Sequence, residues 1–153
     1  MKVYSLTREQ EVSRPLSEVF AFFARPENLA RLTPGTLGFE ILTPGPLVMK
    51  AGTVIDYTLR IMQVPTHWRT LIETYEPPDR FVDIQLKGPY KFWHHTHSFT
   101  ARGQGTLIRD EVHYSLPFGM LGRLVHSLWV RRQLEGIFDF RQHFIRAKFG
   151  GGG

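Results

Sequence analysis

The chain has 153 residues, of which 42% are hydrophobic, and a formal net charge of +5. This length suffices for one domain with a sizeable core and is short for two, so we expect a single domain over residues 1–149. There is no cysteine, which excludes disulfides, thiolate metal sites and thiol catalysis and fits a reducing compartment, for which we take the cytoplasm.

The positive charge is concentrated near the C-terminus. Between residues 118 and 149 six basic side chains against Glu135 and Asp139 leave +4, which is most of the total. A basic face on a terminal helix is usually a solvated surface, so no nucleic-acid partner is expected. The first residues alternate in polarity and include charges, so we expect neither a signal peptide nor integral membrane association.

The N-terminal part of the chain predicts one strand and two short helices. Residues 2–12 have the pattern of a strand, and Pro15 suits the first turn of a helix. This helix has apolar residues at spacings of three and four, which predicts one buried stripe: Leu16, Val19, Phe20 and Phe23. A second short helix is expected over residues 26–35.

From about residue 37 the hydrophobic period changes from about 3.6 to 2, which is typical of antiparallel strands. Turns rich in Pro and Gly divide the region into six strands: residues 37–42, 53–62, 67–75, 81–86, 91–101 and 106–116. Together with the first strand they predict an α+β fold in which a curved antiparallel sheet carries its helices on one face. A helix of about thirty residues follows from residue 118, and residues 150–153, all Gly, are expected to be a flexible tail.

The apolar stripe of the C-terminal helix changes face partway along. One face carries Leu121, Leu124, Val125 and Leu128. The nearly opposite face carries Leu134, Ile137, Phe138, Phe144 and Ile145. Arg131 and Arg132 mark the change, so we expect a kink there or a separate first helical segment that packs elsewhere.

The stretch KFWHHTHSF places three histidines on one expected strand. The loop that follows makes Ala101 and Thr106 partners, and this register sets His97 opposite Asp110. One face of the two strands is then mainly apolar: Trp93, His95, His97, Phe99, Ile108, Asp110, Val112, Tyr114 and Leu116. It should be the inner face, because a slip of one residue would bury the polar set instead.

The same procedure extends to the preceding strands. A turn over residues 63–66 would pair Ile61 with Trp68, Leu59 with Thr70 and Tyr57 with Ile72. In the next strand simple alternation sends Val82, Ile84 and Leu86 inward. A bulge at the following Gly-Pro would bring Asp83 and Gln85 inward instead, and both alternatives stay open.

The inward histidines allow four interpretations. Imidazole and carboxylate are ligands for zinc or iron, but no further firm ligand is identifiable, so no metal is expected. A His-Asp pair could act as base and orienter, although the sequence places no nucleophile beside it. His97 and Asp110 could also satisfy each other in the core. Finally, a few polar groups among aromatic side chains are typical of a ligand cavity.

The chain resembles the ligand-binding SRPBCC proteins of the START and polyketide cyclase superfamily, in an uncharacterised bacterial branch, in three segments: PLSEVFAFFARPENLARLTP, PPDRFVDIQLKGPYKFWHHTHSF and GTLIRDEVHYSLPFGMLGRL. The resemblance implies a helix-grip fold with two short helices after the first strand. In this fold a seven-stranded curved antiparallel sheet wraps around a long C-terminal helix and leaves a hydrophobic cavity between them. It implies lipids, sterols, polyketides or plant hormones as ligands, and cyclase, dehydratase or hydrolase activity in some members. Asp83 and Gln85 belong to the family pattern, which implies that both face the cavity.

We therefore expect a protein that binds a small hydrophobic or amphipathic molecule, without a metal or organic cofactor. The expected apolar wall is Tyr57, Leu59, Trp68, Ile72, Trp93, Val112, Tyr114, Ile137 and Phe138. The expected polar contacts are Asp83, Gln85, His95, His97 and Asp110.

Two other functions remain open. One is a cyclase, dehydratase or hydrolase acting on a polyketide-like or aromatic ketone substrate, with His95 or His97 as general base and Asp110 as its orienter. The other is an interaction surface for a homodimer or a membrane-surface contact: Phe118, Met120, Leu121 and Trp129.

Overall fold

The computed structural model describes residues 2–151, apart from the side chain of Ser127. The elements are, in chain order, β1 (Tyr4–Val12), α1 (Leu16–Phe23), η1 (Pro26–Ala30), η2 (Gly35–Leu37), β2 (Glu40–Ile41), β3 (Val54–Ile61), β4 (Val64–Glu76), β5 (Arg80–Lys87), β6 (Phe92–Arg102), β7 (Gly105–Ser115), α2 (Gly119–Val125), η3 (His126–Val130) and α3 (Arg131–Phe149). η1 and η2 are 3₁₀ helices, and η3 is π-helical.

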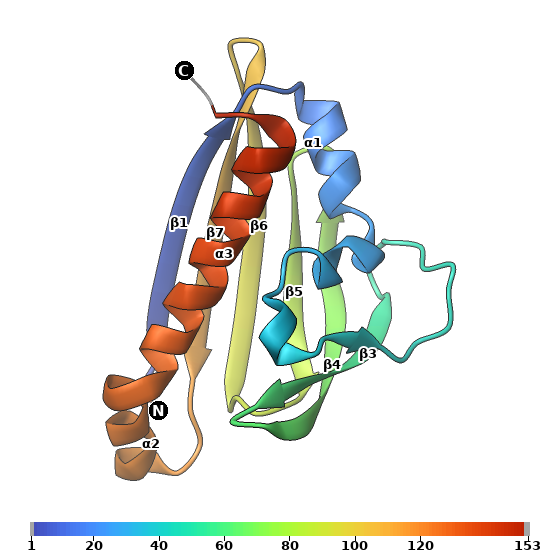
Figure 1. Ribbon diagram of the computed structural model, residues 1–153. Helices are drawn as coiled ribbons and strands as arrows, with labels where there is room; N and C mark the ends of the chain where they lie inside the picture. Colours follow the sequence, from blue (N-terminus) through green and yellow to red (C-terminus); the bar gives the residue numbers. More distant parts are fainter. Residues whose placement is uncertain (1, 152–153) are drawn as a thin grey trace.

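The strands form one seven-stranded antiparallel sheet in the order β1-β7-β6-β5-β4-β3-β2. Figure 1 shows α3 running along the sheet in front of β1, β7 and β6, with α1 and the short helices on the same side. The predicted helix-grip fold, with a curved sheet around a long C-terminal helix, is confirmed.

Two clusters of buried side chains hold the helices on the sheet. The first joins α1 to the end of α3 and includes Val19, Phe20, Phe23, Phe99, Ile108, Ile145 and Phe149. The second lies under the first half of α3 and includes Tyr57, Trp68, Trp93, Val112, Tyr114, Leu134 and Phe138. Three of the four residues of the stripe predicted for α1 are therefore buried, because their spacing puts them on one face of the helix.

The β6–β7 hairpin has the predicted register. Ala101 pairs with Thr106 and His97 with Asp110. The turn contains Gly103 at a φ of 60°, a left-handed conformation that glycine adopts without steric cost. The register turns His95, His97 and Asp110 to the inner side of the sheet, where all three are buried.

The register predicted for the β3–β4 hairpin is wrong. The pairs are Tyr57 with Trp68, Leu59 with Thr66 and Ile61 with Val64. The turn consists of Met62 and Gln63, whose φ angles are 52° and 68°, so it is a two-residue turn without the glycine that usually marks one. Because the error is an even number of residues, every side chain stays on its predicted face.

Two N-terminal expectations are also corrected. The second helix, expected over residues 26–35, is the short η1, and residues 37–42 contain only the two-residue strand β2. Gly38 has a φ of 56°, which interrupts an extended strand between η2 and β2.

The helical conformation is unbroken from Gly119 to Phe149, so the alternative of a separate first helix is wrong. The predicted change of face coincides with η3, directly before Arg131. A π-helical turn contains an extra residue and so rotates the following face about the axis. Three residues of the α3 stripe, Leu134, Phe138 and Ile145, are buried and the other two are half-buried. The stripe of the first segment is exposed: Leu121, Leu124, Val125 and Leu128.

Gly151 forms an isolated bridge with Val12, and the last two glycines of the expected tail lie outside the described residues. Of the helices in residues 2–151, none is long and apolar enough to cross a membrane.

Candidate functional site

A cavity of about 180 Å³ lies between the sheet, α3 and the short helices. Its floor comes from β3 and β4, one wall from α3, and another from the segment that joins α1 to β2. Most of the lining is apolar and includes Leu29, Phe39, Ile55, Leu59, Leu134 and Ile137. A cavity of this kind accepts an apolar molecule and leaves orientation to the few polar groups in its wall.

Ten of the fourteen residues predicted for the site line the cavity: Tyr57, Leu59, Trp68, Ile72, Asp83, Trp93, His95, His97, Ile137 and Phe138. The other four lie elsewhere. Val112 and Tyr114 are buried in the core with 0% and 1% exposure. Asp110 lies behind the histidines, and Gln85 binds the backbone of Tyr90 through two hydrogen bonds of 2.7 and 3.1 Å.

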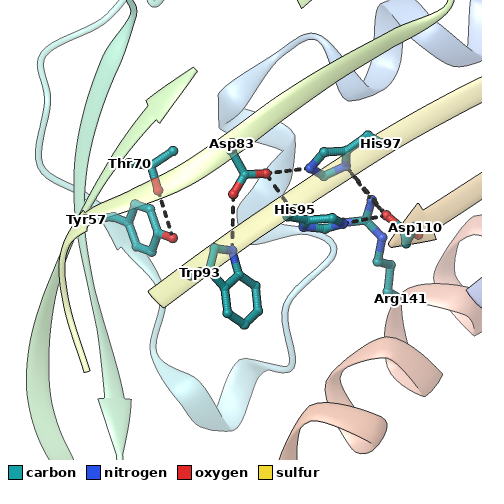
Figure 2. Close-up of polar contacts among 8 residues, drawn as sticks. All are labelled: Tyr57, Thr70, Asp83, Trp93, His95, His97, Asp110 and Arg141. Carbon is teal, nitrogen blue, oxygen red and sulfur yellow. Dashed lines mark hydrogen bonds and ion pairs between the residues drawn. The ribbon is translucent and has the colours of Figure 1, made fainter. Parts of the chain in front are cut away.

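A buried polar cluster closes one side of the cavity, and Figure 2 shows its members converging from β5, β6, β7 and α3. His97 Nε2 lies 2.5 Å from Asp83 Oδ2. His95 Nε2 lies 2.8 Å from Asp110 Oδ1. The Arg141 guanidinium donates to the same Asp110 oxygen over 3.1 Å.

Each histidine hydrogen-bonds to the aspartate that lies opposite the other histidine in the strand register. His97 is paired with Asp110 across the strands, but the closest distance between their side chains is 3.5 Å, from Nδ1 to Oδ1. The interpretation in which His97 and Asp110 satisfy each other in the core is therefore wrong. The imidazole rings of His95 and His97 are stacked with centroids 3.6 Å apart, and each ring makes its hydrogen bond to a different carboxylate.

Asp83 faces inward and uses both carboxylate oxygens. Oδ2 accepts from His97, and Oδ1 accepts from Trp93 Nε1 over 3.3 Å. The pairing of β4 with β5 is irregular between Arg69 and Thr70 and between Ile72 and Thr74. Phe81 and Asp83 both line the cavity and pair with β6 without a shift, so the alternative that sends Val82, Ile84 and Leu86 inward is wrong.

Arg141 was not predicted from the sequence. It lies on the buried face of α3 with 6% exposure, and its guanidinium packs 5.1 Å from the Phe23 ring centroid and 5.9 Å from that of Phe138. The signal that could have revealed it is a single basic residue within an apolar helical stripe.

The charges of the cluster are strongly coupled. Burial, aided by the charge of His95, lowers the pKa of His97 to about 4, so this ring is neutral at pH 7. Burial opposes ionisation of Asp110, but the Arg141 guanidinium and then the His95 hydrogen bond outweigh it and lower its pKa. Asp83 also has a lowered pKa, because the two histidines outweigh its burial.

Every imidazole nitrogen of the cluster faces a protein group. His95 Nδ1 lies 3.6 Å from Asp83 Oδ2, so both nitrogens of this ring face carboxylates. His97 Nδ1 lies 3.4 Å from Arg141 Nη2, which is placed to donate to it. This arrangement leaves no imidazole nitrogen free to accept a proton from a bound substrate.

Two buried N–H groups, in contrast, have no acceptor among the described residues. They are Trp68 Nε1 and Arg141 Nε, and both side chains line the cavity. A second polar position in the wall is the Tyr57 hydroxyl, 3.5 Å from Thr70 Oγ1.

Asp83, His95 and His97 are also the one group in the described part of the chain whose ligand atoms could hold a metal ion, all within 4.8 Å of one another. A cation bound to His97 Nε2 would leave the ring proton on Nδ1, where it would face the N–H of Arg141. The buried guanidinium would also repel the ion. The donor set therefore fits a hydrogen-bonded cluster better than a metal centre.

Residues 4–149 match the family described as polyketide cyclase / dehydrase and lipid transport. The chain belongs to this family, and the resemblance to SRPBCC proteins is confirmed. No curated protein matches the sequence.

Solved structures show the same fold at low identity. Ginseng major latex-like protein 151 from Panax ginseng has 14% identity and a TM-score of 0.70, with 96% of this chain and 97% of that one covered. A START superfamily protein from Mycobacterium smegmatis has 13% identity and a TM-score of 0.68, with coverages of 94% and 98%. Norcoclaurine synthase from Thalictrum flavum, solved with dopamine and hydroxybenzaldehyde, has 15% identity and a TM-score of 0.66, with coverages of 94% and 87%.

Proposed function

We propose that the protein binds a small, mostly apolar molecule in the cavity and that a hydrogen-bond acceptor on this molecule meets the indole N–H of Trp68 or the guanidinium of Arg141. The observation that carries the proposal is the pair of buried N–H groups without an acceptor in the described chain, on two residues that line the cavity. An unsatisfied buried donor costs about 1–3 kcal/mol, which a carbonyl or similar oxygen of a ligand would recover. Membership of a family whose description includes lipid transport supports an apolar ligand.

The size of the cavity supports a compact ligand. Its volume of about 180 Å³ is close to that of an apolar cavity of about 150 Å³ that binds benzene. A molecule with one aromatic or alicyclic ring and a short substituent matches this volume.

The arrangement of the histidines supports a binding role over a role as catalytic bases. A general base needs a nitrogen within hydrogen-bond reach of the substrate, whereas all four imidazole nitrogens already face protein groups. The cluster is suited to a fixed polar wall that orients a ligand through Arg141.

Acetophenone and ethylbenzene test the proposal, because they share size and differ by one carbonyl oxygen. We expect acetophenone to bind about fivefold more tightly, with a shift of the Trp68 indole N–H resonance in NMR titrations. Trp68→Phe should remove most of the difference, whereas Trp129→Phe, which changes a tryptophan outside the cavity lining, should keep it. Equal binding of both probes, or a difference that survives in Trp68→Phe, would contradict the assignment of the acceptor.

A second pair of variants tests the cavity itself. Ile137→Trp should fill the cavity and abolish binding of both probes. Val48→Trp, at a position with 68% exposure, should leave binding unchanged. Probe binding that persists in folded Ile137→Trp would place the ligand elsewhere.

A further inference from the structure

Large apolar side chains gather on the surface of α2 and the start of η3. They are Phe118 at 79% exposure, Met120 at 81%, Leu121 at 62%, Leu124 at 55%, Val125 at 41% and Leu128 at 66%. Clusters of this kind on a protein surface mark interaction sites. Ligand binding in the cavity makes no use of them, because none of the six lines it.

The opposite face of this segment is firmly packed, so its orientation is set by the fold. His126 Nε2 lies 2.8 Å from the Tyr114 hydroxyl, and its ring stacks on Tyr4 with centroids 3.5 Å apart. A Cβ on Gly122 would come within 2.2 Å of the Pro117 carbonyl oxygen, so the helix here approaches the chain that leads into it too closely for a side chain. The apolar stripe must therefore face outward. Trp129, which we expected to share this surface, packs instead against the second core cluster.

Basic side chains predominate at the same end of the molecule. The antiparallel sheet brings the starts of β1, β2, β4 and β6 and the ends of β3, β5 and β7 to one end, the lower end in Figure 1, where α2 also lies. The chain stretches at this end, residues 2–6, 40–41, 58–66, 86–92 and 112–134, contain a single acidic residue, Glu40, which is exposed and lies opposite Thr58. Their basic side chains are all exposed: Lys2, Arg60, Lys87, Lys91, Arg123, Arg131 and Arg132. Glu135, one turn further along α3, pairs with Arg131 over 3.2 Å.

We propose that this end of the protein docks on a lipid surface that carries anionic headgroups, with the six exposed apolar side chains of α2 and η3 inserted at the interface. Apolar residues beside Lys and Arg are the combination that interfacial helices use, because the side chains enter the acyl boundary while the charges meet the headgroups. A second copy of the chain fits less well, since a symmetric contact would bring two sets of like charges together. Docking requires no occupant in the cavity and goes beyond the proposed binding function.

Co-sedimentation with vesicles tests the docking. The full chain is mixed with vesicles of phosphatidylcholine alone or with about one third phosphatidylserine. We expect binding to the anionic vesicles that weakens between about 0.1 and 0.5 M NaCl, and little binding to the neutral ones. Arg123→Glu should lower the partition coefficient at least about fivefold, whereas Arg14→Glu, exposed at the other end of β1, should not.

The apolar contribution has its own variants. Combined Leu121→Ser and Leu124→Ser should abolish vesicle binding, whereas Val48→Ser, exposed on the loop before β3, should leave it intact. Circular dichroism checks that both remain folded.

Absence of wild-type binding to anionic vesicles would overturn the proposal. So would a concentration-dependent dimer in light scattering that the double serine variant abolishes while anionic vesicles fail to bind. Loss of acetophenone binding with vesicle binding intact would count against the proposed ligand function alone.

Discussion

The stacked rings of His95 and His97 bind carboxylates on different neighbouring strands, Asp110 on β7 for the first and Asp83 on β5 for the second. Arg141 then ties Asp110 to α3. The cluster therefore joins three central strands to the long helix as well as forming the polar wall of the cavity. We therefore expect the charged side chains of this cluster to affect both the stability of the fold and ligand binding.

Stability should decrease when the pH is lowered from neutral. His97 has a pKa of about 4 in the folded chain against a usual value of 6.5. Between these two values the unfolded chain takes up a proton that folded His97 does not, so the free energy of unfolding falls with the pH, by at most roughly 3 kcal/mol. Below that window the lowered pKa values of Asp83 and Asp110 cause a further loss in the same direction.

Urea denaturation at several pH values between 6.5 and 4 checks this dependence. His97→Gln, which keeps a donor for Asp83 but cannot titrate, should show a shallower decrease. His143→Gln, exposed on α3, should keep the wild-type slope. An unchanged slope in His97→Gln would assign the effect to other groups.

Removal of the Arg141 charge should destabilise the fold strongly. Arg141→Met leaves Asp110 and its neighbours without their buried cation, and breaking a buried ion pair from one side costs about 3–5 kcal/mol. Arg146→Met, exposed on the same helix, should change the free energy of unfolding by less than about 0.5 kcal/mol. Adding Asp110→Asn to Arg141→Met should recover part of the loss. A double variant as unstable as the sum of the single ones would show that the two groups are not coupled.

Two glycines should respond to alanine in opposite ways. Gly136 lies exposed within α3, where a Cβ meets nothing within 4 Å, so Gly136→Ala should stabilise the protein by about 1 kcal/mol. At Gly105 a Cβ would come within 2.3 Å of the Val12 carbonyl oxygen, so Gly105→Ala must displace β1 and should cost about 1–3 kcal/mol. Thermal unfolding should show melting temperatures that move in opposite directions by a few degrees. A stabilising Gly105→Ala would mean that β1 yields easily.

His126 should act as the anchor of α2. His126→Leu leaves the Tyr114 hydroxyl, on a side chain only 1% exposed, without its partner, and an unsatisfied buried group costs about 1–3 kcal/mol. Amide exchange in α2 should accelerate more than in α3. His143→Leu serves as the matched control and should leave both rates unchanged. Uniform acceleration over the chain would indicate a global loss of stability instead.

Local patterns were enough for the β6–β7 hairpin and the histidines. A period of two and a short glycine-containing turn define register within one hairpin, so the inward direction of His95, His97 and Asp110 follows from nearby residues. The same reasoning misplaced the β3–β4 pairs, because Met62 and Gln63 form the turn with positive φ angles, which residues of these types rarely adopt.

The sequence by itself determined the order of elements, the antiparallel sheet under a long helix and the faces of the central strands, since these depend on periodicity and turn chemistry within short segments. Only the tertiary structure decided that Asp83 rather than Asp110 binds His97, that Arg141 completes the cluster from 31 residues beyond Asp110, and that the stripe of α2 is exposed. These outcomes depend on how bulged strands and a π-helical turn pack against one another, and no local pattern carries that information.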